Sequence, residues 1–178
     1  MRGIVNKGGQ VWVETVIYTL IGLTIMGLVL AVALPKINAK KDEVLINQAI
    51  QAMGDIDNKV YLVQGAALNR RTVDLDIGKG KVIIDVGENT ISWVIDSRFK
   101  YSEPGFPSTM GNMIILTEET DPWTVTMTIH YAVDIRFGED MVTGTKELGS
   151  APTPYKLMVE NAGNDPVTGN LIVKLSVS

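Results

Sequence analysis

The stretch VWVETVIYTLIGLTIMGLVLAVAL, residues 11–34, decides the architecture of this chain. Glu14 is the only acidic or basic residue among its 24 members. A helix of this length measures about 36 Å, which exceeds the ~30 Å hydrocarbon core of a bilayer. Because the apolar region of a secretory signal has only about 7–15 residues, the stretch predicts a membrane helix that is retained. Conventional cleavage at the small-x-small sequence Ala31-Val32-Ala33 is an alternative.

A second helical pattern follows the apolar stretch. Apolar residues recur three or four positions apart with charged residues between them, which is typical of a helix that packs on one side. Pro35 lies between the two patterns, where the loss of one backbone donor predicts a kink rather than an end. We therefore expect one helix over 10–66, with its membrane or filament-core part over 10–35. The apolar positions of the second pattern are Leu45, Ile46, Ala49, Ile50, Met53, Ile56, Val60 and Val63.

Beyond Arg71 the apolar residues alternate with polar ones, which predicts β-strands over 72–178. The expected fold class is α+β, with the long N-terminal helix followed by an antiparallel seven-strand β-sandwich as the head domain. The stretch 123–137 is long for a single strand, so we expect a bulge or bend within it. The seven candidate strands are 73–77, 82–86, 91–95, 113–117, 123–137, 155–160 and 171–177.

The composition offers little material for catalysis. The formal net charge is −4, so no basic surface invites nucleic acid. There is no cysteine, which excludes disulfides, thiolate metal sites and a cysteine nucleophile. The single histidine, His130, falls on the polar face of the stretch 123–137, and we interpret it as a solvent-facing residue. We expect no enzyme, no cofactor and no metal site in this chain.

Glu14 has two interpretations from the residues alone. A carboxylate well inside a bilayer costs roughly 2.5–3.5 kcal/mol, so an intramembrane acid indicates a function. The same acid lies near one end of the apolar stretch, where it offsets the helix dipole by about 0.3–1 kcal/mol. A single-pass anchor could therefore carry Glu14 at the membrane interface without a further role.

The residues before the apolar stretch bear on this choice. The octet KGGQVWVE, residues 7–14, preceded by Arg2, resembles the class III signal of archaeal type IV pilin precursors. The resemblance implies that a prepilin peptidase recognises Gly8 and Gly9 and cuts between Gly9 and Gln10. Removal of residues 1–9 would leave 178 − 9 = 169 residues. The resemblance also implies that the apolar helix stays in the mature protein and is followed by a β-sandwich.

The resemblance implies roles in assembly for several residues. The new α-amine of Gln10, with a pKa of about 7.7–8.0, would pair with Glu14 of a neighbouring subunit in the filament core. Gly22 and Gly27 are small positions at which helices could approach closely. Pro35 joins them as the expected kink. Cyclisation of Gln10 to pyroglutamate would abolish the amine and is an open alternative.

The function that the resemblance implies is a structural subunit of an archaeal type IV pilus. The chain would polymerise with itself through its N-terminal helix into an extracellular filament for adhesion. Its partners would be the prepilin peptidase, the pilus assembly ATPase and its membrane platform, with no nucleic acid. The precursor would lie in the cytoplasmic membrane and the mature subunit at the cell surface.

Two alternatives are kept. An archaellin, the subunit of the motility filament, shares the signal and the architecture but typically lacks an acid at the fifth mature position, which here is Glu14. A monomeric membrane-anchored binding domain would keep residues 1–9. Basic residues lie on both sides of the apolar stretch, so their count leaves the membrane orientation undecided.

Overall fold

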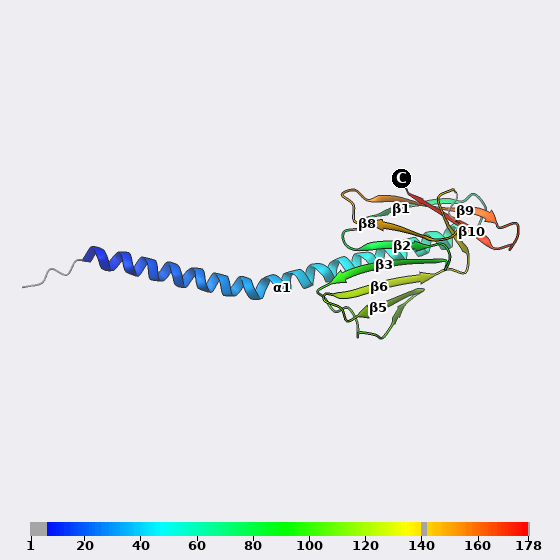
Figure 1. The fold of residues 1–178 in the computed structure, drawn as a ribbon. Coiled ribbons are helices and arrows are strands. Elements are labelled where there is room, and N and C mark those ends of the chain that lie inside the picture. The colour runs from blue at the N-terminus through cyan, green and yellow to red at the C-terminus, as the bar shows by residue number, and fades with distance from the viewer. Residues whose placement is uncertain (1–6, 140–141, 178) are drawn as a thin grey trace, which may run out of the picture. The chain divides into compact units, whose positions relative to one another are not determined.

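The computed structural model describes residues 7–139 and 142–177, with side chains from residue 11 onward. In this described part, a single helix, α1 (Lys7–Val63), precedes ten strands (Figure 1). The chain divides into two compact units, one reaching to Lys40 and the other starting at Lys41. The α+β class expected from the sequence is confirmed. The strands are β1 (Arg70–Leu75), β2 (Lys81–Asp85), β3 (Thr90–Ser97), β4 (Ser108–Met110), β5 (Met113–Glu118), β6 (Trp123–His130), β7 (Asp134–Phe137), β8 (Thr145–Gly149), β9 (Tyr155–Asn164) and β10 (Leu171–Val177).

The number of strands corrects the sequence prediction, which gave seven where the described residues form ten. The stretch 123–137 is divided into β6 and β7 by a break at 131–133, at the kind of bend that its length predicts. The other additional strands are β4 and β8. They lack an alternating apolar pattern, because β4 has three residues and β8 buries only Leu148. Pairing with neighbouring strands, rather than local sequence, makes them strands.

The strands form two sheets. The six-stranded sheet has the order β4-β5-β6-β3-β2-β8, and its strand pairs are antiparallel. The four-stranded sheet has the order β1-β9-β10-β7, and β10 pairs with β7 in parallel. The expectation of a wholly antiparallel sandwich is thereby corrected. The break at 131–133 is the reason, because it takes the chain out of the six-stranded sheet and lets β7 join the other sheet alongside β10.

Asn89 fixes this break from the turn between β2 and β3. Its backbone is left-handed, with φ of 52°, a conformation that asparagine tolerates better than most residues. Its carbonyl oxygen accepts a hydrogen bond from the N–H of Tyr131 at 2.9 Å. Its side-chain oxygen accepts another from the N–H of Ile135 at 2.8 Å. One turn of the six-stranded sheet therefore anchors both the end of β6 and the start of β7.

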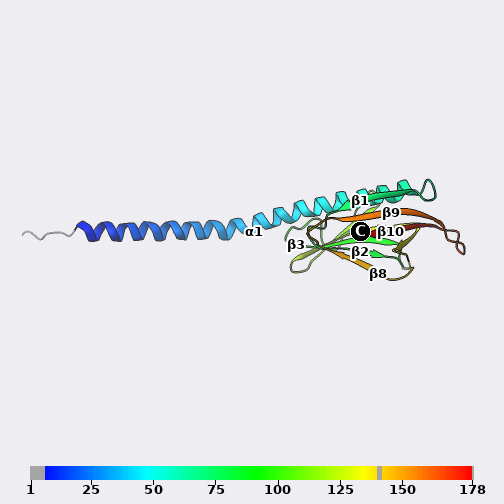
Figure 2. The same ribbon diagram turned by 90° about the horizontal axis from the view of Figure 1, so that it is seen from above.

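One hydrophobic core joins residues 41–63 of α1 to both sheets. Figures 1 and 2 show this part of the helix beside the sheets. The apolar stripe expected from the sequence is confirmed, although Leu45 is only half-buried. In β6 the expected alternation is confirmed as well, since inward residues are buried and His130 is exposed. The buried helix residues are Ile46, Ala49, Ile50, Met53, Ile56, Val60 and Val63.

Asp42 ties the start of the packed part of α1 to the strands. Lys79, in the turn between β1 and β2, places its Nζ 2.6 Å from one carboxylate oxygen. The backbone N–H of Arg98, just after β3, donates to the other oxygen at 2.7 Å. The side chain of Asp42 is only 9% exposed, so its charge is compensated by two donors rather than by water. The contact fixes the helix against two separate connections of the head domain.

Two asparagines hold the end of α1. Asn161 on β9 is buried, and its Nδ2 donates to the carbonyl of Val63 at 2.9 Å while its Oδ1 accepts from the N–H of Gly163 at 2.9 Å. Asn69 donates from Nδ2 to the carbonyl of Leu62 at 3.0 Å. The last carbonyls of a helix have no intrahelical donor, so these side chains satisfy groups that would otherwise be left unpaired.

We predict that Asn161→Leu destabilises the head domain by about 2–4 kcal/mol, because it leaves the Val63 carbonyl buried without a donor. The measurement is urea unfolding of the full chain in detergent, followed by the fluorescence of Trp93, which is buried in the core. Asn47→Leu is the matched control, because Asn47 is exposed on α1; its effect should stay within about 0.5 kcal/mol. Equal stabilities of the two variants would contradict the capping role.

Asp165 organises the turn between β9 and β10. Its Oδ1 accepts hydrogen bonds from the backbone N–H groups of Val167 at 2.8 Å and Thr168 at 3.0 Å. Its Oδ2 lies 2.5 Å from the guanidinium of Arg136 on β7. The backbone hydrogen bonds from Thr168 and Val167, followed by the bond and charge of Arg136, hold the pKa of the Asp165 carboxyl below its usual value. The carboxylate thus links the turn to the parallel neighbour of β10.

This lowered pKa predicts a direction for the effect of acid. The folded state favours the ionised carboxyl, so the stabilisation is complete above the ordinary Asp pKa of 3.8 and is lost as the pH falls through the lower folded pKa. In a nuclear magnetic resonance titration, the amide protons of Val167 and Thr168 should shift with a midpoint below 3.8. Asp165→Asn should abolish that transition. A midpoint at or above the ordinary value would refute the assignment.

Candidate functional site

The candidate site is the apolar segment of α1, residues 11–34. Residues 11–32 are all exposed, and the described chain contains one helix long and apolar enough to cross a membrane. Sixteen large apolar side chains between Val11 and Leu34 are exposed. Keeping them in water costs on the order of 20 kcal/mol, whereas a folded domain is stable by about 5–15 kcal/mol. The segment therefore requires a membrane or a protein partner around it.

The polar side chains within the apolar segment are adapted to such surroundings. The hydroxyls of Thr15, Thr19 and Thr24 donate to the carbonyls four residues earlier, at 2.8–2.9 Å. Each hydroxyl is therefore satisfied by the helix itself and needs no water. Glu14 is the one residue of the segment that brings a charge into it.

Glu14 is exposed on α1, one helical turn after Gln10. It takes part in none of the ion pairs formed between described residues. The acid is only three residues from the start of the apolar segment, so both interpretations from the sequence are compatible with its place. A cation from outside the described chain, or the membrane interface, must offset its charge in an apolar environment.

The predicted processing site lies at the edge of what the structure describes. Residues 1–6 lie outside the described residues. Gly8, Gly9 and Gln10 belong to the helical backbone of α1, but their side-chain surroundings are not part of the description. Cleavage between Gly9 and Gln10 accordingly stays a prediction from the sequence.

Gly22 and Gly27 offer two separate places for close approach. A Cβ added at either glycine meets no atom within 4 Å, so the helix surface is open at both positions. Because successive residues of an α-helix are about 100° apart, two residues five apart point about 140° away from each other. The two glycines therefore lie on different faces and cannot form one contact strip. They suit a bundle in which each helix touches partners on more than one side.

Pro35 lies inside α1, and the helix continues beyond it to Val63, in agreement with the expectation that it would not end the helix. A proline at this position cannot donate a backbone hydrogen bond to the carbonyl of Ala31. This leaves a locally weakened turn immediately after the apolar segment.

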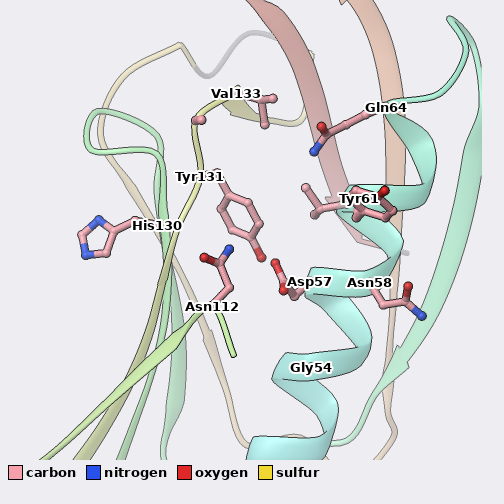
Figure 3. Close-up of a pocket in the computed structure, with 11 residues that line it drawn as sticks. Gly54, Asp57, Asn58, Tyr61, Gln64, Asn112, His130, Tyr131 and Val133 are labelled. Atoms are coloured by element: carbon pink, nitrogen blue, oxygen red, sulfur yellow. The ribbon is translucent and has the colours of Figure 1, made fainter. Parts of the chain in front are cut away.

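The head domain contains a pocket that the sequence analysis did not predict. It lies between the last turns of α1 and the break after β6, and Tyr131 and Asp57 face each other in it (Figure 3). The sequence places Tyr131 correctly on the inward face, but it gives no sign that the phenol would open into a pocket. His130 borders the pocket but is exposed, and its ring points away from Tyr131 and Asp57 in Figure 3. Within the described residues, no group of three or more His, Cys, Asp or Glu side chains could hold a metal ion.

Comparisons with known proteins found no match to this chain among protein-family models, curated proteins or solved structures. The site is therefore interpreted from its own residues. What they establish is a pilin-like architecture: a long apolar N-terminal helix, exposed along the apolar segment, followed by a domain of two β-sheets.

Proposed function

We propose that this chain is the structural subunit of a filament of the archaeal type IV pilus kind, built by packing of the apolar segments of many copies. The observation that carries the proposal is the apolar segment itself, which is helical, exposed on every side and long enough to span a bilayer. Such a helix is stable in lipid before assembly. In a filament core, other copies of the same helix replace the lipid.

The predicted cleavage just before Glu14 favours assembly over simple anchoring. Cleavage after Gly9 creates a cationic α-amine at Gln10, four residues before the carboxylate. Within one helix these two groups are separated by about 6 Å along the axis. Between helices shifted by about one turn, the amine of one subunit meets the carboxylate of the next. Each charge is costly in an apolar core without the other, so the pair favours one register of docking.

Maturation and export follow from the same proposal. A prepilin peptidase removes residues 1–9 at the membrane, and the assembly ATPase with its membrane platform extracts the subunit into the growing filament. The head domain is then displayed outside the cell, where it serves adhesion. The chain acts as a building block rather than as an enzyme.

Two other functions make different predictions. An archaellin-type motility filament shares the signal and the architecture, but the acid at Glu14 argues against it. If the chain were an archaellin, deletion of its gene would stop swimming. A monomeric surface-binding domain would keep residues 1–9 and dissolve in detergent as a monomer. N-terminal sequencing of material sheared from cells separates a filament subunit from the monomeric domain, because only a processed filament subunit begins at Gln10 or its cyclised form. Loss of swimming on deletion separates the two kinds of filament.

We predict that Glu14→Gln abolishes filaments while maturation stays normal. The substitution keeps the size of the side chain and removes the charge, which leaves the Gln10 amine unpaired at a cost of about 3–5 kcal/mol. Filament yield, measured as subunit sheared from cells relative to subunit in membranes, should fall at least a hundredfold. Thr15→Ala is the control, because its hydroxyl bonds only to the Val11 carbonyl of its own helix. Normal filaments from the Glu14 variant would refute the pairing.

A second prediction concerns processing. Gly9→Val should block cleavage, so the mass spectrum of the membrane-bound chain should show all 178 residues instead of 169. Gly3→Val, within the same leader but away from the proposed cut, should mature normally. If the Gly9 variant yields a chain that begins at Gln10, the cleavage site is wrong. If the unaltered protein keeps residues 1–9, the monomeric anchor becomes the better interpretation.

A further inference from the structure

A pocket of about 480 Å³ lies in the head domain, between residues 54–64, at the end of α1, and the break after β6 (Figure 3). Its volume falls in the range of small-molecule sites, about 300–1,000 Å³. The polar groups come from two sides: Asp57, Asn58 and Gln64 from the last turns of α1 and the residue after it, and Tyr131 and Asn112 from the break after β6 and the turn between β4 and β5. The pocket exists because β6 and β7 are interrupted at this place, where the chain crosses between sheets.

The hydroxyl of Tyr131 is the most unusual group in the pocket. Its oxygen is buried, and it finds no hydrogen-bond partner among the described residues. In Figure 3 it points between Asp57 and Asn112. A buried polar group without a partner costs about 1–3 kcal/mol, so such groups usually have a purpose. Burial, and then the nearby charge of Asp57, raise the pKa of Tyr131, which keeps the phenol protonated and available as a donor.

The charges of the lining exclude several kinds of ligand. Asp57 supplies a carboxylate, and the described lining contains neither lysine nor arginine; His130 borders the pocket, but its ring points away from Asp57 and Tyr131 in Figure 3. A phosphate or carboxylate ligand would therefore meet a repulsive charge, with no lysine or arginine in the described lining to compensate it. An ammonium ligand would suit Asp57, but it cannot accept hydrogen bonds from the phenol or from the amide NH₂ groups. The lining thus favours a ligand that both donates and accepts.

Neutral sugars have this chemistry, because each hydroxyl donates one hydrogen bond and accepts others. Asp57 offers acceptors, Tyr131 a donor, and Asn112 both within one amide. Tyr61, also on the pocket wall, is 72% exposed and presents a ring against which the apolar C–H face of a pyranose can pack. Hydrogen-bonding groups and an exposed aromatic ring in the same lining together match a polyhydroxylated ring.

We propose that this pocket binds a neutral pyranose sugar, with Asp57 accepting from its hydroxyls, Tyr131 donating to one of them and Tyr61 packing against its ring. The site lies entirely within the unit that starts at Lys41. It goes beyond the filament function, because it requires neither cleavage after Gly9 nor assembly through Glu14. A head domain with such a site would bind sugars on the surface to which the filament adheres.

The test is a titration of the isotope-labelled full chain, observed by nuclear magnetic resonance. The protein is kept in octaethylene glycol monododecyl ether micelles, because this detergent carries neither a sugar nor a charge. Galactose, glucose, mannose and N-acetylglucosamine are the probes, with spermidine and inorganic phosphate as the cationic and anionic comparisons. At least one sugar should shift the amide signals of residues 54–64 and 131–133 with a millimolar dissociation constant.

Three substitutions identify the groups involved. Tyr131→Phe removes only the unpaired hydroxyl, so sugar affinity should fall about three- to tenfold while the thermal midpoint stays equal or rises. A purely structural tyrosine would not show this combination. Asp57→Asn and Tyr61→Ala should also weaken binding. The controls are Asp55→Asn, an exposed acid on α1 outside the lining, and Phe106→Ala, an exposed aromatic outside it; both should bind as the unaltered chain does.

Several results would overturn the proposal. One is the absence of sugar-dependent shifts at about 50 mM, well above a millimolar dissociation constant. A second is binding of spermidine or phosphate in the pocket without binding of any sugar. A third is unchanged sugar affinity in Tyr131→Phe with its fold intact. None of these results bears on filament formation, so the two proposals fail separately.

Discussion

The apolar segment, residues 11–34, imposes the constraint on which the rest of the molecule depends. A helix exposed on every side with this composition cannot stay in water, because its exposed apolar surface costs more than a typical domain gains by folding. From Lys41 onward the same helix has one polar face and one buried face. The change of surface along α1 thus divides the chain into two parts. The first must be covered by a membrane or a protein partner, and the second has its own hydrophobic core.

A single charge makes this constraint specific. Apolar packing alone is tolerant of sliding and rotation, and Gly22 and Gly27 on different faces favour close contact without fixing a register. Glu14 differs, because a carboxylate in an apolar core is stable only when a cation lies beside it, at one position along the helix axis. A proteolytic cut four residues earlier would supply that cation only after maturation. The order of events, first cleavage and then docking, would then follow from electrostatics.

Local periodicity explains which parts of the fold could be predicted. The helical stripe from Ile46 to Val63 and the alternation in β6 can be predicted from the sequence, because burial recurs there with the period of the helix or of the strand. The parallel pairing of β7 with β10 could not be predicted, since the break before β7 is held by two hydrogen bonds that Asn89, more than forty residues earlier in the chain, accepts from Tyr131 and Ile135. For the candidate site, the apolar segment, Glu14 and the different faces of Gly22 and Gly27 follow from the sequence, whereas the open space beside both glycines is seen only in the structure.

The break that Asn89 anchors has a second consequence. If β6 had continued unbroken to residue 137, as its alternating pattern suggests, Tyr131 would have been one more inward residue of a continuous strand. Instead the chain leaves the sheet beside the final turns of α1, and the phenol enters a space whose opposite wall carries Asp57. Whether a buried hydroxyl has a hydrogen-bond partner depends on all the elements packed around it, so no local sequence pattern predicts that it lacks one. The same crossing that joins the two sheets therefore creates the polar recess of the head domain, at the cost of one unsatisfied group that a ligand's hydroxyl can satisfy.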